Sequence, residues 1–191
     1  KDAQFLRRKE EKIRKYQDGE VDIWSFFGDY MILGDSRAEG FKVYEFISDS
    51  QVLADRGDKI TNILDHEKEI ITFNPSVIIF SYGLNDIGQY ASADDYVKEY
   101  SEVLSKLKSK LPNTQFYINS IIPKLSEKSS GDSITFTNKV EEMCKDQGYG
   151  YIDCTALSDE NKNLYEQDGV HFKSDFYPIW AEYIIKTIFS D

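Results

Sequence analysis

The chain has 191 residues, of which 40% are hydrophobic and 30% are charged, and this composition is typical of a globular protein rather than a disordered one. Its length predicts one domain with a substantial buried core, with or without a short appendage. The formal net charge of −11 repels phosphate backbones, so we expect no nucleic-acid partner. No stretch approaches the roughly 20 apolar residues that cross a bilayer, so we expect no transmembrane segment.

The first twenty residues form a charged segment. Residues 1–20 contain seven Lys or Arg and five Asp or Glu, and residues 3–17 are predicted to be a helix. We interpret residues 1–20 as a solvated helix, with a membrane-proximal or linker role as the alternative, and residues 21–191 as the main domain. The chain begins with Lys rather than Met, which suggests that a signal peptide or membrane anchor was removed. We therefore expect an extracellular or cell-envelope location, and a cytoplasmic one is the alternative.

Apolar runs and helical patterns alternate over the rest of the chain. The runs are short and rich in β-branched and aromatic residues, which predicts strands at residues 30–33, 51–54, 77–82, 115–121 and 149–153. Apolar residues at helical spacing predict helices at residues 59–73, 93–111, 133–147 and 174–189, the last one capped by Ser174. Strands that alternate with helices pair in parallel, which predicts an α/β fold: a three-layer α/β/α sandwich around a mostly parallel sheet of about five strands.

The chain contains two thiols, Cys144 and Cys154. Two cysteines are too few for a disulfide scaffold or for a four-ligand zinc site. We expect two free, partly buried thiols, and one disulfide between them is the alternative.

Polar residues and glycines follow several of the predicted strands. Ser36 follows the first strand, Gly57 the second and Asn85 the third, and His171 precedes the last helix. Ligands of open parallel sheets bind at the carboxyl ends of the strands. We therefore expect these four residues to lie along one edge of the sheet.

Together, these residue types can perform acyl transfer. A serine hydroxyl becomes an effective nucleophile when an imidazole accepts its proton, and a carboxylate fixes the tautomer of that imidazole. We predict Ser36 as the nucleophile and His171 as its base, with Asp168, three residues earlier, as the orienting acid. The oxyanion donors would be the backbone N–H groups of Ser36 and Gly57 and the side-chain amide of Asn85.

In this order, the blocks resemble the SGNH or GDSL-type serine hydrolase family. The matching residues are Gly34-Asp35-Ser36, Gly57, Gly83-x-Asn85-Asp86 and Asp168-x-x-His171. The resemblance extends from about residue 30 to about residue 183, so residues 21–191 would be an SGNH hydrolase domain. It implies a flavodoxin-like sheet, a shallow and exposed site, and no metal or organic cofactor. It also implies the catalytic and oxyanion roles given above.

Arg37 is where the sequence departs from the family pattern, which has Leu after the serine. Arg37 and Arg56 flank the predicted site, so either could bind an anionic group of a substrate. Each could instead pair with a nearby carboxylate such as Glu39 or Asp58, and we favour this structural role.

Tyr82, Leu84 and Ile87 lie around the third block, and together with Arg37 they are candidates for lining a substrate pocket. Alternatively, Tyr82, Leu84 and Ile87 could belong to the hydrophobic core. We interpret Asp86 as an anchor for its loop rather than a substrate contact. The second histidine, His66, lies in a charged stretch, and we expect it to face solvent.

These features predict a serine esterase that removes a small acyl group, such as acetyl, from a carbohydrate or similar alcohol. An O-acyltransferase acting on a cell-envelope polysaccharide is an alternative, because it would use the same acyl-serine intermediate. A non-catalytic binding module on the same fold is a third interpretation, which the complete set of site residues disfavours. An α/β-hydrolase fold is the alternative architecture, but it requires glycine at position 38, where this chain has Ala, so we reject it. We expect a small-molecule or carbohydrate ester as partner, and the sequence leaves the oligomeric state open.

Overall fold

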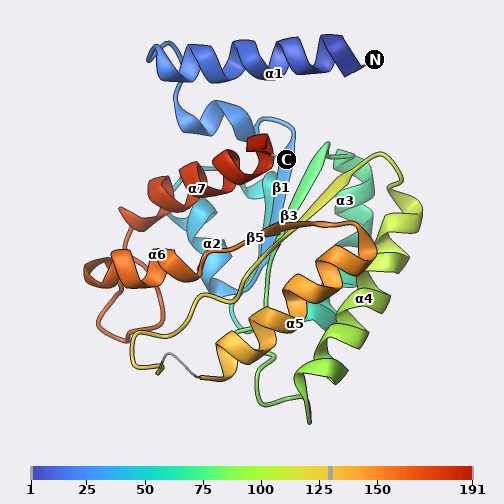
Figure 1. Cartoon of the computed structure of the whole chain (residues 1–191), viewed down its shortest axis with the longest axis vertical. Coiled ribbons are helices and arrows are strands. Elements are labelled where there is room, and N and C mark those ends of the chain that lie inside the picture. The colour runs from blue at the N-terminus through green and yellow to red at the C-terminus, as the bar shows by residue number, and fades with distance from the viewer. Residues whose placement is uncertain (1, 129–130, 191) are drawn as a thin grey trace.

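The computed structural model describes residues 2–128 and 131–190. Lys1, the first residue of the predicted segment 1–20, and Asp191, the last residue of the predicted domain 21–191, lie outside the described residues. Five parallel strands form one sheet in the order β2-β1-β3-β4-β5 (Figure 1). The strands are β1 (Tyr30–Gly34), β2 (Val52–Ala54), β3 (Val77–Ser81), β4 (Gln115–Asn119) and β5 (Gly150–Ile152). This arrangement confirms the predicted α/β/α sandwich.

Helices cover both faces of the sheet (Figure 1). The α-helices are α1 (Asp2–Gln17), α2 (Ser36–Val43), α3 (Glu67–Phe73), α4 (Ala93–Lys110), α5 (Asp132–Gln147), α6 (Thr155–Glu160) and α7 (Phe176–Ser190). The short 3-10 helices are η1 (Ile23–Phe27), η2 (Asp49–Gln51), η3 (Ile60–His66) and η4 (Lys162–Leu164). Apolar side chains of η1, α2, α6 and α7 pack on one face, and those of η3, α3, α4 and α5 pack on the other.

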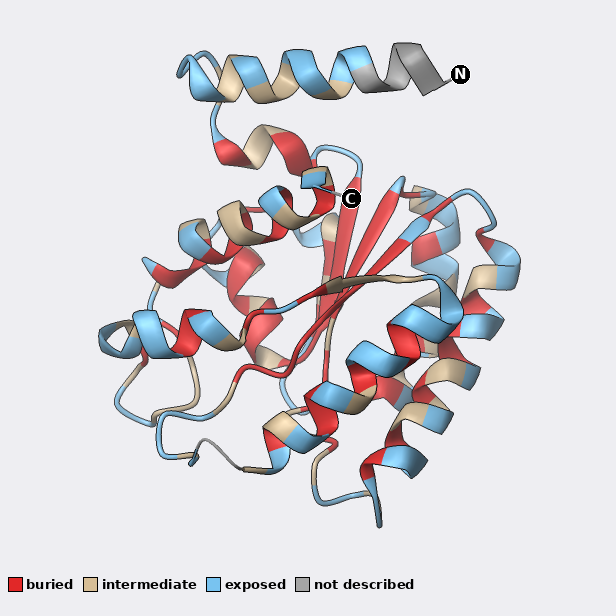
Figure 2. Ribbon diagram, viewed as in Figure 1, coloured by how far each residue is buried: buried red, intermediate tan, exposed pale blue. Residues whose placement is uncertain are grey.

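The central strands are apolar at every position because both of their faces are covered. All five residues of β1 are buried, and so are the first four residues of β3. A strand with alternating polar residues would bury polar side chains in the hydrophobic core on one face of the sheet. In Figure 2 the strands accordingly form a buried centre, and the exposed residues lie on the outer faces of the helices.

Two predicted helices differ from the structure. Residues 59–73 divide into η3 and α3 rather than forming one helix. Ile60 and Ile63 are three residues apart and both fully buried, a spacing that aligns side chains on a 3-10 helix. The last helix begins at Phe176, two residues after the predicted cap at Ser174, and a turn closed by the hydrogen bond from the N–H of Phe176 to the carbonyl of Lys173 precedes it.

The N-terminal helix lies at one end of the molecule, beyond η1 (Figure 1). Its observed contacts are aromatic and cationic: Tyr16 meets Phe26 edge-to-face at 5.7 Å, and Lys9 and Lys12 lie over Phe189 and Phe26. The described part of the chain contains no helix that is both long and apolar enough to cross a membrane.

The two cysteines are free and buried, as predicted. Cys154 belongs to the core on the α7 face of the sheet and Cys144 to the core on the α4 face, so the sheet separates them. Burial raises the pKa of the Cys144 thiol to about 12, which keeps it neutral at physiological pH.

Candidate active site

The strand register brings the predicted blocks together at one edge of the sheet. Gly34, the last residue of β1, pairs with Ala54 at the end of β2 and with Ser81 at the end of β3. The chain therefore leaves all three strands at the same level. Ser36 lies two residues after the end of β1, and Asn85 lies four residues after the end of β3, so both follow strands that end at this edge.

Ser36 occupies the first position of α2. The preceding residue, Asp35, caps this helix, because its carboxylate accepts a hydrogen bond from the backbone N–H of Arg37 at 3.0 Å. Asp35 is buried, and burial raises its pKa to about 6. The buried cap fixes the turn and leaves Ser36 half-buried at its surface.

Ser36, His171 and Asp168 form a continuous series of hydrogen bonds. The Oγ atom of Ser36 lies 2.9 Å from Nε2 of His171. Nδ1 of the same imidazole lies 2.6 Å from the Asp168 carboxylate. A residue separation of 135 between Ser36 and His171 shows that the fold, not local sequence, creates this contact.

The ionisation of Asp168 sets the direction of these bonds. The hydrogen bond from His171, and then the backbone N–H groups of His171 and Val170, hold the pKa of Asp168 well below its usual range. The carboxylate therefore accepts only, so Nδ1 of His171 must be the donor. When Nδ1 carries the only ring proton, Nε2 accepts a hydrogen bond from the hydroxyl of Ser36, as a general base requires.

The proposed oxyanion donors lie on two neighbouring loops. Gly57 is exposed and has a φ of +88°, a backbone conformation that strongly favours glycine. The side-chain amide of Asn85 donates a hydrogen bond to the carbonyl of Asp58 at 3.0 Å, which fixes its loop against that of Gly57. The oxyanion roles of these residues stay predictions.

Asp86 ties the third block to the rest of the fold. It is fully buried, and its carboxylate accepts a hydrogen bond from the backbone N–H of Ile60, the first residue of η3. Burial raises the pKa of Asp86 to about 7. The interpretation of Asp86 as a loop anchor agrees with these contacts.

Arg37 does not line a substrate pocket. Its side chain turns into the protein, where only 3% of the residue is exposed, and donates to the backbone carbonyls of Val170 and Ile122. The favoured structural role is therefore the one observed, but the hydrogen-bond partners are carbonyl groups rather than Glu39 or Asp58. Arg56, in contrast, is exposed.

The other pocket candidates divide into core and surface. Tyr82 is buried in the core on the α4 face, so it is not available to a substrate. Leu84 and Ile87 line an open hollow of about 450 Å³ together with residues of the loop before α5.

This β4–α5 loop was not among the predicted site elements, although it borders the site. The backbone N–H of Leu125 donates to the carbonyl of Gly169 at 2.8 Å, between Asp168 and His171. Leu125 itself is 43% exposed. The sequence offers no signal that this loop meets the loop of His171, because the hydrogen bond joins backbone groups more than 40 residues apart.

His66 does not face solvent freely, contrary to the prediction. Its Nε2 atom lies 3.8 Å from the carboxylate of Asp58, and both side chains are largely buried. Among the described residues, Asp55, Asp58 and His66 are one group whose ligand atoms lie within 4.8 Å of one another, as a metal would require. Asp55 is exposed and already pairs with Lys42 at 3.6 Å, and Asp58 lies against His66, so contacts within the protein account for the group.

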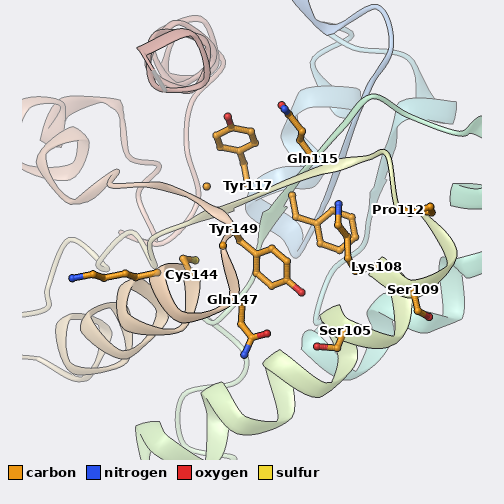
Figure 3. Close-up of a pocket in the computed structure, with 13 residues that line it drawn as sticks. Ser105, Lys108, Ser109, Pro112, Gln115, Tyr117, Cys144, Gln147 and Tyr149 are labelled. Carbon is orange, nitrogen blue, oxygen red and sulfur yellow. The ribbon is translucent and has the colours of Figure 1, made fainter. Parts of the chain in front are cut away.

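A larger hollow, of about 840 Å³, lies at the opposite edge of the sheet. Figure 3 shows it between the ends of α4 and α5 and the first residues of β4 and β5. Its only thiol, Cys144, is neutral at physiological pH. Of its two lysines, Lys108 and Lys145, the first donates to the carbonyl of Thr114. The hollow contains no histidine or carboxylate to act as a base, so the chemistry is expected at Ser36.

Comparison with protein families places most of the chain in one group. The model of the GDSL-like lipase/acylhydrolase family matches residues 18–184. No curated protein matches the chain.

Solved structures of esterases share the fold. A putative acylhydrolase from Bacteroides fragilis superposes with a TM-score of 0.67 at 16% identity, covering 84% of this chain and 87% of that one. An acetyl xylan esterase gives 0.62 at 20% identity, covering 83% and 99%. A family 3 carbohydrate esterase from Clostridium thermocellum gives 0.66 at 14% identity, covering 84% and 94%. At these identities the likeness establishes the fold.

Proposed function

The chain belongs to the GDSL-like lipase/acylhydrolase family of carboxylic ester hydrolases, and we propose that it is a serine esterase that removes a small acyl group, such as acetyl, from a carbohydrate or similar alcohol. The observation that carries the proposal is the hydrogen-bonded series from Ser36 through His171 to Asp168. The order of the three side chains and their hydrogen-bond distances are those that nucleophilic catalysis by a serine requires.

In the proposed first step, the Oγ atom of Ser36 attacks the carbonyl carbon of the ester. Its proton passes to Nε2 of His171, and the Asp168 carboxylate stabilises the resulting imidazolium. The carbonyl oxygen becomes an oxyanion, which the N–H groups of Ser36 and Gly57 and the amide of Asn85 would stabilise. Collapse of this intermediate breaks the ester bond, and the leaving alcohol takes the proton from His171.

The second step releases the acyl group. His171 removes a proton from water, and the hydroxide attacks the acyl-serine. The second tetrahedral intermediate collapses to carboxylic acid, and the proton on His171 returns to Oγ of Ser36. The free enzyme is thereby restored, and the two steps together convert ester and water into alcohol and carboxylic acid.

Two observations support a small acyl group on a carbohydrate. The nucleophile is half-buried at the surface, and the neighbouring hollow beside Leu84 and Ile87 is open, which suits a bulky alcohol better than a long enclosed acyl chain. Two proteins of similar fold are described as an acetyl xylan esterase and a carbohydrate esterase.

Substitution of the nucleophile tests the proposal. Ser36→Ala should reduce hydrolysis of 4-nitrophenyl acetate by at least about 1,000-fold, because the acyl acceptor is lost while binding groups remain. The rate of hydrolysis is measured from the release of 4-nitrophenol. Unfolding curves of the variant are the control that it folds. Full activity in the folded variant would exclude Ser36 as nucleophile.

The acceptor of the acyl group is measured separately. With an acetylated oligosaccharide as donor and an unacetylated one as acceptor, we expect acetate release into water to exceed acetyl transfer. Predominant transfer would instead identify an O-acyltransferase that uses the same serine. An extracellular or cell-envelope location remains a prediction, to be tested by fractionating the producing cells.

A further inference from the structure

We propose that Arg37 is a positioning residue that fixes His171 against Ser36. The inference rests on the proposed function, because it concerns the base of the same reaction. Arg37 follows Ser36 directly in sequence, and its side chain reaches the loop that carries His171, more than 130 residues further along the chain.

The guanidinium contacts the two residues that flank His171. Its Nε atom donates to the backbone carbonyl of Val170 at 2.8 Å, and its carbon atom lies over the side-chain ring of Phe172, 4.9 Å from the ring centroid. A second nitrogen donates to the carbonyl of Ile122, which lies in the loop that follows β4. One residue therefore holds two of the loops that meet at Ser36.

The backbone of Arg37 is itself fixed. Its N–H donates to Asp35, and its carbonyl accepts a hydrogen bond from the hydroxyl of Tyr177 on α7 at 2.7 Å. Because the backbone of Arg37 is fixed, its guanidinium has little freedom to move, and the carbonyl groups that it binds are held in place. The 2.9 Å contact between Ser36 and His171 thus depends on a short, rigid path through the adjacent residue.

Arg37 is poorly suited to the two simpler roles. It is 3% exposed, so it cannot meet an anionic substrate. As a purely stabilising residue it would be a costly choice, because a buried cation needs compensation and an apolar side chain often fills such a site equally well. Burial lowers the pKa of Arg37, and one guanidinium nitrogen has no hydrogen-bond partner among the described residues. The planar fork of arginine does, however, match two carbonyls at once.

The test compares Arg37→Leu and Arg37→Lys with the wild-type enzyme on 4-nitrophenyl acetate. Arg37→Leu should lower kcat by roughly 10- to 100-fold with little change in KM, because a small displacement of a catalytic group is this damaging. Arg37→Lys should recover part of the loss, since an ammonium group can reach one of the two carbonyls. Cys144→Ala, a buried substitution on the opposite face of the sheet, is the matched control and should retain the wild-type kcat.

A double-mutant comparison separates positioning from general damage. If Arg37 acts through His171, adding Arg37→Leu to His171→Ala should reduce the residual rate no further. An equal loss in both backgrounds would overturn the proposal, and so would a folded Arg37→Leu enzyme with wild-type kcat. If both Arg37 variants fail to fold at 10 °C while Cys144→Ala folds, Arg37 serves stability and the proposal is wrong.

Labelling with a fluorophosphonate distinguishes this proposal from the proposed function. A wild-type enzyme that reacts with the probe while Arg37→Leu reacts at the same rate would refute only the role of Arg37. A folded wild-type enzyme that does not react would refute the serine mechanism and with it the proposal for Arg37.

Discussion

Two buried carboxyl groups support the site without facing a substrate. Asp35 caps the helix that begins at Ser36, and Asp86 holds the third block to the start of η3. Burial raises the pKa of Asp35 to about 6 and that of Asp86 to about 7, whereas an unfolded aspartate titrates near 3.9. The folded protein therefore retains protons that the unfolded chain has lost.

This difference predicts how stability depends on pH. Between about pH 4 and pH 7 the folded state binds more protons than the unfolded state, so these groups lower the free energy of unfolding as the pH rises. Asp86→Asn keeps the acceptor for the N–H of Ile60 but cannot ionise. We expect its urea unfolding curves to show a weaker decline from pH 5 to pH 7, by on the order of 1 kcal/mol per pH unit. An unchanged pH dependence would show that Asp86 does not titrate there.

Close contact between α2 and α7 determines how the helix of the nucleophile packs. Gly40 lies in the middle of α2, and a Cβ atom added there would overlap the hydroxyl end of the Tyr177 ring. That ring is buried, and its hydroxyl bonds the carbonyl of Arg37. The absence of a side chain at Gly40 therefore allows the two helices to meet.

Gly40→Ala should destabilise the protein by about 1–3 kcal/mol despite the higher helix propensity of alanine, because the core must open to admit the methyl group. Gly28→Ala is the matched control: its φ is −53°, and the nearest atom to a new Cβ is 3.9 Å away. Thermal unfolding of both variants measures the difference. Equal melting temperatures would mean that α2 and α7 adjust freely.

The sequence predicts the elements that follow simple periodic rules. The five strands, and helices such as α4 and α5, are recovered because apolar runs and amphipathic spacing reflect burial directly. The division of residues 59–73 into η3 and α3 is missed, because both 3-10 and α-helices accept apolar residues three positions apart. Helix α2 is missed because eight residues around Gly40 give no clear periodic signal.

For the site, the sequence is informative about residues that follow strands and less so about residues placed by tertiary contacts. Ser36 and His171 lie 2.9 Å apart, as the sequence predicts, and their catalytic roles stay predictions. For Arg37 and Tyr82 the sequence left a pocket role and a structural role open, because both residues lie beside the site in sequence and only the direction of the side chain shows that they are buried. The partial burial of His66 against Asp58 likewise depends on a loop that has no sequence pattern.

At the scale of the whole molecule, the N-terminal helix and the site lie at opposite ends. Figure 1 shows α1 beyond the amino ends of the strands, whereas Ser36 follows the carboxyl end of β1. Helix α1 meets the rest of the chain through Phe26 and Phe189. Aromatic pairs and cation–π contacts of this kind contribute about 0.5–1 kcal/mol each.

We therefore expect a chain that lacks residues 1–20 to fold and to hydrolyse 4-nitrophenyl acetate at a rate similar to that of the full chain. Its melting temperature should fall by several degrees, on the order expected for a loss of about 2 kcal/mol. Circular dichroism and the esterase assay measure both quantities. Loss of cooperative unfolding would show that residues 1–20 are part of the domain.

The central claim is that Ser36 is a nucleophile activated by His171. Its most direct test is mass spectrometry of the protein after reaction with a fluorophosphonate, with Ser36→Ala and His171→Ala treated in parallel. We predict one phosphonyl group on the wild-type protein, located on the peptide that contains Ser36, none on Ser36→Ala, and slow or no labelling of His171→Ala. A folded wild-type protein that remains unmodified, or a label that persists in Ser36→Ala, would contradict the account.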